Sequence, residues 1–270
     1  MPETDHKVAS LILAAGRGSR MKGFDGNKAL LPLRPGKSPY KGTDPILLHI
    51  IESLPTGPKA IVVNHRKEDI MEATGDLGVE YFEQPVLNGT GGALLAARSF
   101  VETVSCSLIL ITMGDVPLVR SSTYVSLLNE LGKNRLALLG FRAADSKQYG
   151  MLEIESGHLK GIVEWKYWKD FPEERKESLG ICNAGIYAIR RKDLLSYLSV
   201  LAARPHKVAK EINGQMRQFE EYFITDLVGY MSRDGLPLGF FTVAHETEVM
   251  GIDDVWALDR AQKIFARGSF

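Results

Sequence analysis

A mostly apolar run near the start of the chain most constrains what it can fold into. Residues 8–15 are apolar apart from Ser10, and glycine follows them at Gly16. A run of this kind, bounded by glycine, is typical of a buried strand in a sheet that is covered on both faces. The next residues combine Gly16 and Gly18 with arginines, and Lys28 follows one short loop later. Glycines let backbone N–H groups approach an anion and cations balance its charge, so this loop is expected to hold phosphate groups.

The first half of the chain alternates short apolar runs with amphipathic helices. Strands are predicted at 60–63, 79–82 and 108–112, and helices at 46–51, 67–74, 93–101 and 121–131, the last capped by Ser121 or Ser122. The segment 32–43 is rich in proline and glycine and is interpreted as a long loop. This alternation predicts an α/β fold with three layers, Rossmann-like, around a mixed but mostly parallel central sheet.

The second half is less regular. Strands are predicted at 136–141, 149–154, 159–164, 181–189 and 238–243, and helices at 194–201, 220–231 and from Asp253 or Asp254 onward. Trp256, Leu258, Ile264 and Phe265 are the expected apolar positions of the last helix. We expect a single domain over residues 1–270, with one half at 7–135 and a second half, including the C-terminal helix, at 136–270.

Charge and cysteine content exclude several classes of protein. Lysines and arginines number 33, as do aspartates and glutamates, and this balance disfavours broad binding to nucleic acids or to a membrane surface. Cys106 and Cys182 lie far apart, which favours reduced thiols over a disulfide framework or a metal cluster. The polar N-terminal residues are unlike a signal peptide, so a cytoplasmic location is expected.

Three unusual loops follow predicted strands. Ligands of open α/β sheets bind beyond the carboxyl ends of the strands, so these loops should meet at one rim. In the first loop, Met21 replaces the third glycine of the dinucleotide fingerprint, and the phosphate-loop pattern that ends Gly-Lys-Ser/Thr is absent. By itself this loop is equally well an ordinary turn with solvated arginines, but Lys28 favours a phosphate site.

The second and third loops also allow a structural alternative. Gln84 has an amide that pairs with the edge of a base, yet Gly89 and the residues after it equally resemble the start of a helix. Asp115 ends a very apolar strand, where it is either a turn residue or a ligand of Mg²⁺. For Asp253, a role as N-cap of the last helix is the favoured interpretation from the residues alone.

The ordered set of loops resembles the sugar-1-phosphate nucleotidyltransferases. The matching segments are LAAGRGSRM from Leu13, EQ from Glu83, MGDVPL from Met113, GIVEWK from Gly161, NAGIY from Asn183, EYFITD from Glu221 and GIDD from Gly251. Within that family, the likeness is greatest to the uridylyltransferase domain of the bifunctional N-acetylglucosamine-1-phosphate enzymes, and molybdopterin nucleotidyltransferase-like proteins are also related. The likeness covers residues 8–265, so an acetyltransferase domain is not expected.

The resemblance implies a reaction and a set of site residues. It implies that an NTP, with UTP favoured, reacts with a sugar 1-phosphate and releases pyrophosphate, and that 7–135 binds the nucleotide and 136–270 the acceptor. The implied catalytic residues are Arg20, Lys28 and Asp115, and the implied Mg²⁺ ligands are Asp115 and Asp253. The implied nucleotide contacts are Leu13, Ala14, Ala15, Gly16, Gly18, Gln84, Gly89 and Thr90, and the implied sugar contacts are Gly150, Glu164, Asn183 and Thr225. Two departures stand out, since Leu87 and Asp253 occupy positions where relatives carry glutamine and asparagine.

Alternatives remain open at this point. The acceptor could be a non-sugar phosphate such as choline phosphate or molybdopterin. A glycosyltransferase that uses a nucleotide-sugar is a second alternative, although an Asp-x-Asp motif would favour it and the strand here ends Gly-Asp-Val. A binding protein that has lost catalysis is a third, which the joint presence of Arg20, Lys28, Asp115 and Asp253 disfavours. The oligomeric state is open.

Overall fold

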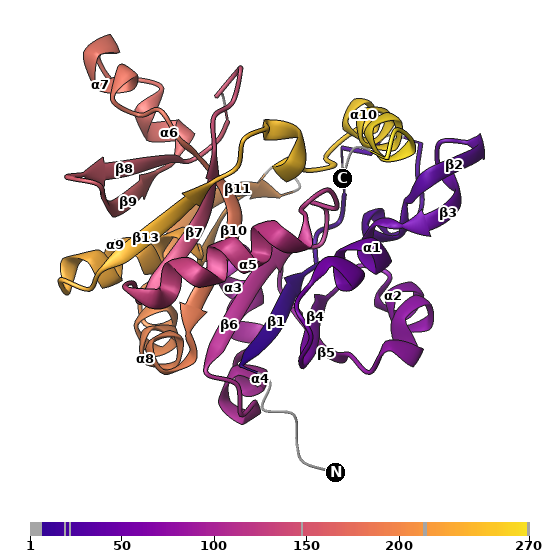
Figure 1. Ribbon diagram of the computed structural model, residues 1–270, viewed down its shortest axis with the longest axis horizontal. Coiled ribbons are helices and arrows are strands. Elements are labelled where there is room, and N and C mark those ends of the chain that lie inside the picture. The colour runs from indigo at the N-terminus through magenta and orange to yellow at the C-terminus, as the bar shows by residue number, and fades with distance from the viewer. Residues whose placement is uncertain (1–6, 19, 22, 147, 213–214, 269–270) are drawn as a thin grey trace.

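A sheet of nine strands forms the middle layer of the computed structural model, which describes residues 7–18, 20–21, 23–146, 148–212 and 215–268. Its strands are β1 (Val8–Leu13), β4 (Lys59–Val63), β5 (Glu80–Glu83), β6 (Leu108–Met113), β7 (Leu136–Phe141), β8 (Met151–Glu155), β9 (His158–Val163), β10 (Cys182–Arg190) and β13 (Leu238–Thr242). Seven of them lie in the order β13-β7-β10-β6-β1-β4-β5, and β8 and β9 extend from β10 (Figure 1).

The direction of the strands confirms the expected mixed sheet. β1 runs parallel to β4 and β6, β4 to β5, and β13 to β7. β10 runs antiparallel to both of its neighbours in this order, β6 and β7. The carboxyl ends of β1, β4, β5 and β6 therefore meet at one rim, where the three loops begin.

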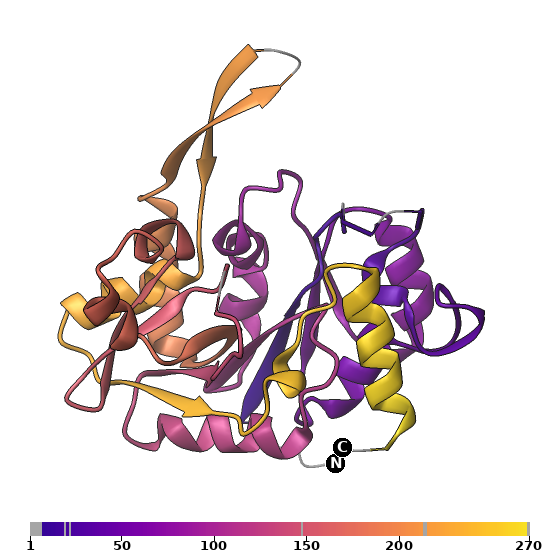
Figure 2. The ribbon, with the colours of Figure 1, turned by 90° about the horizontal axis from the view of Figure 1, so that it is seen from above.

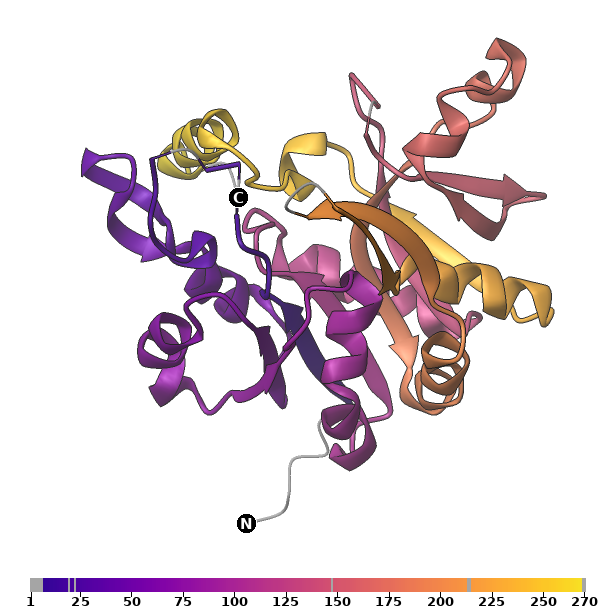
Figure 3. The same ribbon diagram turned by 180° about the vertical axis from the view of Figure 1, so that it is seen from behind.

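Helices cover both faces of this sheet. The α-helices are α1 (Ile46–Ser53), α2 (Lys67–Thr74), α3 (Thr90–Ala96), α4 (Arg98–Thr103), α5 (Ser121–Asn129), α6 (Trp165–Trp168), α7 (Glu173–Glu177), α8 (Arg191–Ala202), α9 (Thr225–Arg233) and α10 (Val255–Ala266). Figure 1 shows α5 in front of the sheet, and Figure 3, seen from behind, shows α3, α4 and α8 over the other face. Strand β1 serves both cores, because Ile12 packs into one and Leu11 and Leu13 into the other. None of the helices in the described part of the chain is long and apolar enough to cross a membrane.

The predicted long loop at 32–43 is wrong. These residues form most of a β-hairpin of β2 (Pro32–Ser38) and β3 (Lys41–Pro45). The prolines fit because the hairpin is a separate two-stranded sheet, whose strands lie at edges that tolerate a missing N–H. Gln262 of α10 donates hydrogen bonds from Nε2 to the carbonyl oxygens of Pro32 and Pro39, both 2.8 Å long, and so joins the hairpin to the C-terminal helix.

A second hairpin corrects the predicted helix at 220–231. Glu220 and Glu221 end strand β12 (Gln215–Glu221), which pairs with β11 (His206–Ile212), and helix α9 begins only at Thr225. Figure 2 shows this hairpin projecting from the body of the molecule. The buried residues of α9, Leu227, Val228 and Met231, lie within the predicted helix, whereas β12 has no regular apolar alternation that would indicate a strand.

Two helix starts also differ from expectation. α3 begins at Thr90 instead of residue 93, so the glycines after Gly89 belong to its first turn. Neither Ser121 nor Ser122 caps α5. Its N-cap position is Arg120, whose N–H donates to Glu248 Oε1 at 3.3 Å, so a carboxylate from the far end of the chain satisfies this helix terminus.

The structure shows which of Asp253 and Asp254 caps the last helix. Asp254 is the N-cap of α10, and its Oδ1 accepts a hydrogen bond of 2.8 Å from the Ala257 N–H. Asp253 is therefore available to the rim of the sheet. The expectation that Trp256 packs inward is wrong, because this residue is 83% exposed. Leu258 and Ala261 are buried as the inner face of the helix.

Removal of the cap should destabilise the fold without removing a charge from the rim. We expect Asp254→Ala to lower the free energy of unfolding by about 1 kcal/mol, because the Ala257 N–H loses its side-chain acceptor. Urea denaturation measures the change. The matched control is Asp259→Ala, which removes an exposed ion pair of the same helix with Lys263 and should cost about 0.5 kcal/mol or less. Equal stability losses in the two variants would contradict the capping role.

Candidate active site

The ends of β1 and β6 form the floor of the site. Leu13 lies opposite Met113 in the parallel register, and the Gly114 N–H donates to the Leu13 carbonyl at 2.9 Å. A Cβ on Gly114 would lie 2.7 Å from Cβ of Ala14, so only glycine permits this close approach. The residues after both strands are thereby held in one wall, with Asp115 at its edge.

A cavity of about 300 Å³ opens above this floor and is called the main cavity. It brings together residues from all three loops that the sequence singled out. Its lining comprises Leu13, Ala14, Ala15, Gly16, Asn27, Lys28, Ala29, Gln84, Leu87, Gly89, Thr90, Ala93, Met113, Gly114 and Asp115. A Cβ added to Gly16 would meet no atom of the described chain within 4 Å, so the backbone of Gly16 faces open space.

Lys28 is held in place by residues on either side of its backbone. Asn27 caps the short 3-10 helix η1 (Lys28–Leu30), and its side chain accepts from the Ala29 N–H at 2.9 Å. The same side chain donates to the His65 carbonyl at 2.7 Å. Gly18 has φ +62°, and a Cβ there would lie 3.1 Å from Cβ of Lys28. The sequence reasoning missed Asn27, although an asparagine ahead of a short helix is a recognisable N-cap signal.

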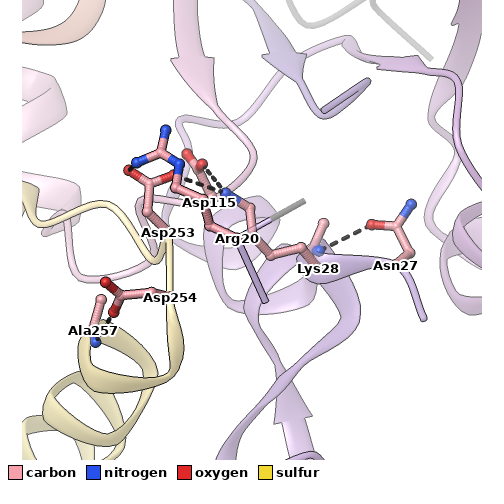
Figure 4. A network of polar contacts seen from close by, with 8 residues as sticks. Arg20, Asn27, Lys28, Asp115, Asp253, Asp254 and Ala257 are labelled. Carbon is pink, nitrogen blue, oxygen red and sulfur yellow. Dashed lines mark hydrogen bonds and ion pairs between the residues drawn. The ribbon is translucent and has the colours of Figure 1, made fainter. Parts of the chain in front are cut away.

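Four charged side chains meet at the mouth of the main cavity (Figure 4). Lys28 Nζ lies 2.6 Å from Asp115 Oδ2 and 3.3 Å from Asp253 Oδ1. Arg20 Nη1 lies 3.4 Å from Asp253 Oδ2, although the Arg20 side chain is 68% exposed. The Ile252 N–H donates to the Asp115 carbonyl at 2.8 Å, which brings the segment before α10 to the end of β6.

The same carboxylates fit a divalent cation. Asp115 and Asp253 converge on a single ammonium group, which shows that their geometry suits a positive charge between them. Mg²⁺ is commonly held by one or two carboxylates together with phosphate oxygens of a substrate. In the described part of the chain, no group of three or more His, Cys, Asp or Glu side chains could hold a metal. A cation here would therefore take further ligand oxygens from a bound phosphate or from water.

In the second loop, only one of the two hydrogen-bonding groups of the Gln84 side chain is left for a ligand. Gln84 is buried, and its Nε2 donates to Asn88 Oδ1 and to the Gly89 carbonyl, both at 3.0 Å. Both amide hydrogens are thus used within the loop, and the amide oxygen is the group left for a ligand. Leu87 contributes an apolar surface to the same cavity.

A close backbone contact joins this loop to the second half of the chain, at Tyr222. Gly89 has φ +95° and ψ 174°, a conformation that is essentially restricted to glycine. A Cβ there would lie 2.3 Å from the Tyr222 carbonyl oxygen. The Ile224 N–H also donates to Thr90 Oγ1 at 3.2 Å, so the residues that precede α9 pack directly against the first turn of α3.

A second cavity, of about 310 Å³ and called the aromatic cavity, lies beyond this contact. It is lined by Ile162, Glu164, Trp165, Lys166, Tyr167, His206, Phe223, Thr225 and Asp226. Two predicted acceptor contacts, Glu164 and Thr225, are among them. His206 Nε2 lies 2.8 Å from Asp226 Oδ2, and its ring meets that of Phe223 edge to face at 5.2 Å. His206 was not predicted, because the hairpin that carries it was not recognised, whereas Phe223 lies in the EYFITD segment on which the family resemblance rests.

The other two predicted acceptor contacts lie beside each other and do not line the aromatic cavity. The Asn183 N–H donates to the Gly150 carbonyl at 2.8 Å. The Asn183 side chain donates to Tyr187 Oη and accepts from the Gly185 N–H, each at 2.9 Å, across an irregularity of β10. Burial raises the pKa of Tyr187, which keeps its hydroxyl neutral as a partner for this amide.

Gly150 also adjoins a predicted acceptor residue, because a Cβ on it would lie 3.5 Å from Glu164 Oε2. Trp168 is buried, and its Nε1 donates to the Tyr149 carbonyl at 2.8 Å. Trp165, unlike Trp168, lines the aromatic cavity.

Comparison with known protein families identifies the family to which the chain belongs. The model of the MobA-like NTP transferase domain matches residues 10–202, which is most of the chain, and the chain belongs to this family. The protein GlmU of Novosphingobium aromaticivorans, named bifunctional, is 30% identical over 264 residues, and that of Bartonella bacilliformis is 32% identical over 264 residues. Each alignment covers 96% of this chain but only 52% and 53% of the relative, so the chain spans about half the length of these relatives.

Solved structures confirm the fold. The uridine diphosphate N-acetylglucosamine pyrophosphorylase of Trypanosoma brucei superposes with a TM-score of 0.73 at 14% identity, over 94% of this chain and 64% of that one. A nucleotidyl transferase from Methanothermobacter gives a TM-score of 0.61 at 19% identity, over 98% of this chain and 100% of that one. The predicted three-layer α/β architecture and the resemblance to nucleotidyltransferases are both confirmed.

The contact between Gly89 and Tyr222 can be tested by adding one methyl group. We expect Gly89→Ala to destabilise the chain by about 1–3 kcal/mol more than Gly78→Ala, because the new Cβ collides with a carbonyl oxygen. Gly78 is the matched control, since it also has positive φ but open space around its Cβ position. Thermal denaturation compares the two variants. Equal losses would show that the close approach to Tyr222 does not matter.

Proposed function

We propose that this chain is a nucleotidyltransferase that couples an NTP, with UTP as the expected triphosphate, to a sugar 1-phosphate. An oxygen of the acceptor phosphate attacks the α-phosphorus of the triphosphate. The bond between the α-phosphorus and the bridging oxygen breaks, and pyrophosphate leaves with that electron pair. The products are a nucleotide-sugar and pyrophosphate, and no proton transfer is required because the nucleophile is already an anion.

One observation carries this proposal. Lys28, Asp115 and Asp253 come from three distant segments of the chain. A carboxylate oxygen of each aspartate nonetheless lies within 3.3 Å of Lys28 Nζ, at the mouth of the main cavity. Opposite charges packed together at a cavity mouth are suited to bind a polyphosphate and its cation, because each can exchange its internal partner for a ligand group.

Positioning and charge neutralisation supply the catalysis in this proposal. Residues 14–16 line the main cavity, and the Cβ position of Gly16 is open, so phosphates can lie against this backbone. Arg20 and Lys28 would then balance the charge of the β- and γ-phosphates, which grows as pyrophosphate leaves. The wall formed by the residues after β1 and β6 would hold the α-phosphate in line with the acceptor. This positioning lowers the entropic part of the activation barrier.

Mg²⁺ would be held by Asp115 and Asp253, which converge on one cation position. When bound, it would neutralise charge on the phosphates and orient them. The family relationship is consistent with a divalent cation, and the two-carboxylate set fits one that also takes phosphate oxygens.

The expectation of UTP is supported by Gln84. Its remaining group is a hydrogen-bond acceptor, because both amide hydrogens are bound within the loop. Uracil, thymine and guanine each present an N–H at the middle of their pairing edge, which such an oxygen accepts, whereas adenine and cytosine present an acceptor there. The name of the GlmU relatives does not state a triphosphate, so the base is inferred from this residue and from the resemblance.

The aromatic cavity is the proposed acceptor site. Glu164 and Thr225 provide polar groups for hydroxyls, and Trp165, Tyr167 and Phe223 provide flat apolar faces of the kind that stack on sugar rings. The cavity adjoins the main cavity through the contact of Thr90 with Ile224, so an acceptor there would lie next to a bound nucleotide.

Choline phosphate is a second candidate acceptor, and one observation favours it. Three aromatic rings and the carboxylates of Glu164 and Asp226 surround the aromatic cavity, and such a set also suits a quaternary ammonium group. Lys166 lines the same cavity and opposes this candidate through its positive charge.

A screen of substrate pairs tests the proposed function. We expect pyrophosphate release with Mg²⁺ to be greatest for UTP or dTTP paired with a sugar 1-phosphate, among all common triphosphates tested against sugar 1-phosphates and choline phosphate. A coupled pyrophosphatase assay measures the rate, and reactions without acceptor give the background. Strongest release with choline phosphate would transfer the proposal to the second candidate, and absence of release from every pair would refute both.

Loss of charge at the cavity mouth should abolish the reaction. We expect Asp115→Asn and Lys28→Ala each to lower kcat by about 10²–10³-fold at saturating triphosphate and Mg²⁺, the usual effect of removing one electrostatic contact to a transition state. The matched control is Lys263→Met, which removes a lysine–aspartate pair from the far face of α10. Activity of the wild-type level in either site variant would contradict the assigned roles.

A further inference from the structure

We propose that Lys28 fills the cation position of the site before substrates bind, so that a divalent cation reaches Asp115 and Asp253 only after a triphosphate has drawn the ammonium away. This inference rests on the proposed function, because it takes the triphosphate and the cation as ligands of the main cavity. It adds an order of binding that is built into one side chain.

The geometry of Lys28 is that of a bound cation. Its Nζ makes a short contact of 2.6 Å with Asp115 Oδ2 and a longer one of 3.3 Å with Asp253 Oδ1. The Lys28 side chain is only 12% exposed, so water screens these contacts less than it screens a surface ion pair. The negative charge of the two carboxylates is thus already balanced by the Lys28 ammonium in the free chain.

A divalent cation cannot share this position with the ammonium. Mg²⁺ needs carboxylate oxygens at about 2.1 Å, and these are the oxygens on which Lys28 Nζ lies. An incoming cation would also meet the positive charge of Lys28 at close range. Binding of the metal to the free chain therefore requires that Lys28 leave, which weakens the affinity for the metal.

A triphosphate removes this obstacle. Phosphate oxygens accept charge-assisted hydrogen bonds from an ammonium group, and lysine carries that group on a flexible stem. The backbone of Lys28 is fixed by the cap at Asn27, and its stem lies beside Gly18 of the phosphate-binding loop. The ammonium can therefore turn from the carboxylates toward phosphates while the backbone stays in place.

Arg20 is a weaker competitor for the same carboxylates. Its guanidinium lies 3.4 Å from Asp253, and its side chain is 68% exposed; among the described ion pairs it has none with Asp115. Lys28 alone among the described lysines and arginines bridges the two aspartates. The coupling between triphosphate and metal is accordingly assigned to Lys28, and thermodynamic linkage makes it reciprocal.

Direct binding of Mn²⁺, followed by electron paramagnetic resonance, tests the proposal without turnover. We expect the full chain to bind Mn²⁺ weakly alone, and Lys28→Met to bind it about tenfold more tightly or better, since about 1.4 kcal/mol of removed competition produces that change. Lys28→Gln, a second neutral variant, should behave alike. The matched control Lys263→Met loses an ion pair of α10 and should equal the wild type.

A UTP analogue with a non-hydrolysable α,β bridge completes the experiment. It should tighten Mn²⁺ binding by a larger factor in the wild type than in Lys28→Met, after correction for Mn²⁺ bound by the analogue alone. Asp115→Asn in the Lys28→Met background should remove the gain, which locates the ion at the carboxylates.

The outcomes separate this inference from the proposed function. Folding of each variant is checked by circular dichroism. If both neutral variants bind Mn²⁺ no more tightly than the wild type in the absence of the analogue, the inference is overturned even when pyrophosphate release is observed. If the gain in affinity is found and no substrate pair releases pyrophosphate, the competition stands and the proposed function fails.

Discussion

The ion pairs of Lys28 with Asp115 and Asp253 are the interaction on which the site depends. They join the loop after β1, the loop after β6 and the segment before α10, which are separated along the chain by most of its length. Charges that are packed together without a ligand must compensate one another, because isolated charges are costly to shield from water. The cluster is therefore both a structural tie in the free chain and a ready set of groups for phosphates and a cation.

The fold makes this meeting possible. Parallel pairing of β1 with β6 places Leu13 beside Met113, so the loops that follow both strands begin at one rim. The hydrogen bond from Ile252 to Asp115 brings the chain's last segment to the same rim, and Asp254 caps α10 so that Asp253 can face Lys28. On the other side, Gly89 allows Tyr222 to approach closely, which sets the aromatic cavity beside the main one.

Local patterns predicted much of the fold and the residues of the main cavity, because a buried strand that ends in glycine or aspartate is visible in the sequence. They failed where pairing is decided by distant partners. Prolines in β2 indicated a loop, yet Gln262 of α10 binds that hairpin. The start of α5 is capped by Glu248 instead of a nearby serine, and Trp256 faces solvent although its spacing suggested the core. His206 lines the aromatic cavity because of an unrecognised hairpin, and no local pattern in the sequence predicts that placement.

The proposed reaction is the transfer of a nucleotidyl group to the phosphate of a small acceptor. The most direct measurement is ³¹P nuclear magnetic resonance of a reaction that contains UTP, N-acetylglucosamine 1-phosphate and Mg²⁺. We expect two coupled diphosphate resonances of a nucleotide-sugar, which grow in equal amounts with pyrophosphate. Accumulation of UMP or UDP with the sugar 1-phosphate unchanged would contradict it, because hydrolysis would then have taken the place of transfer.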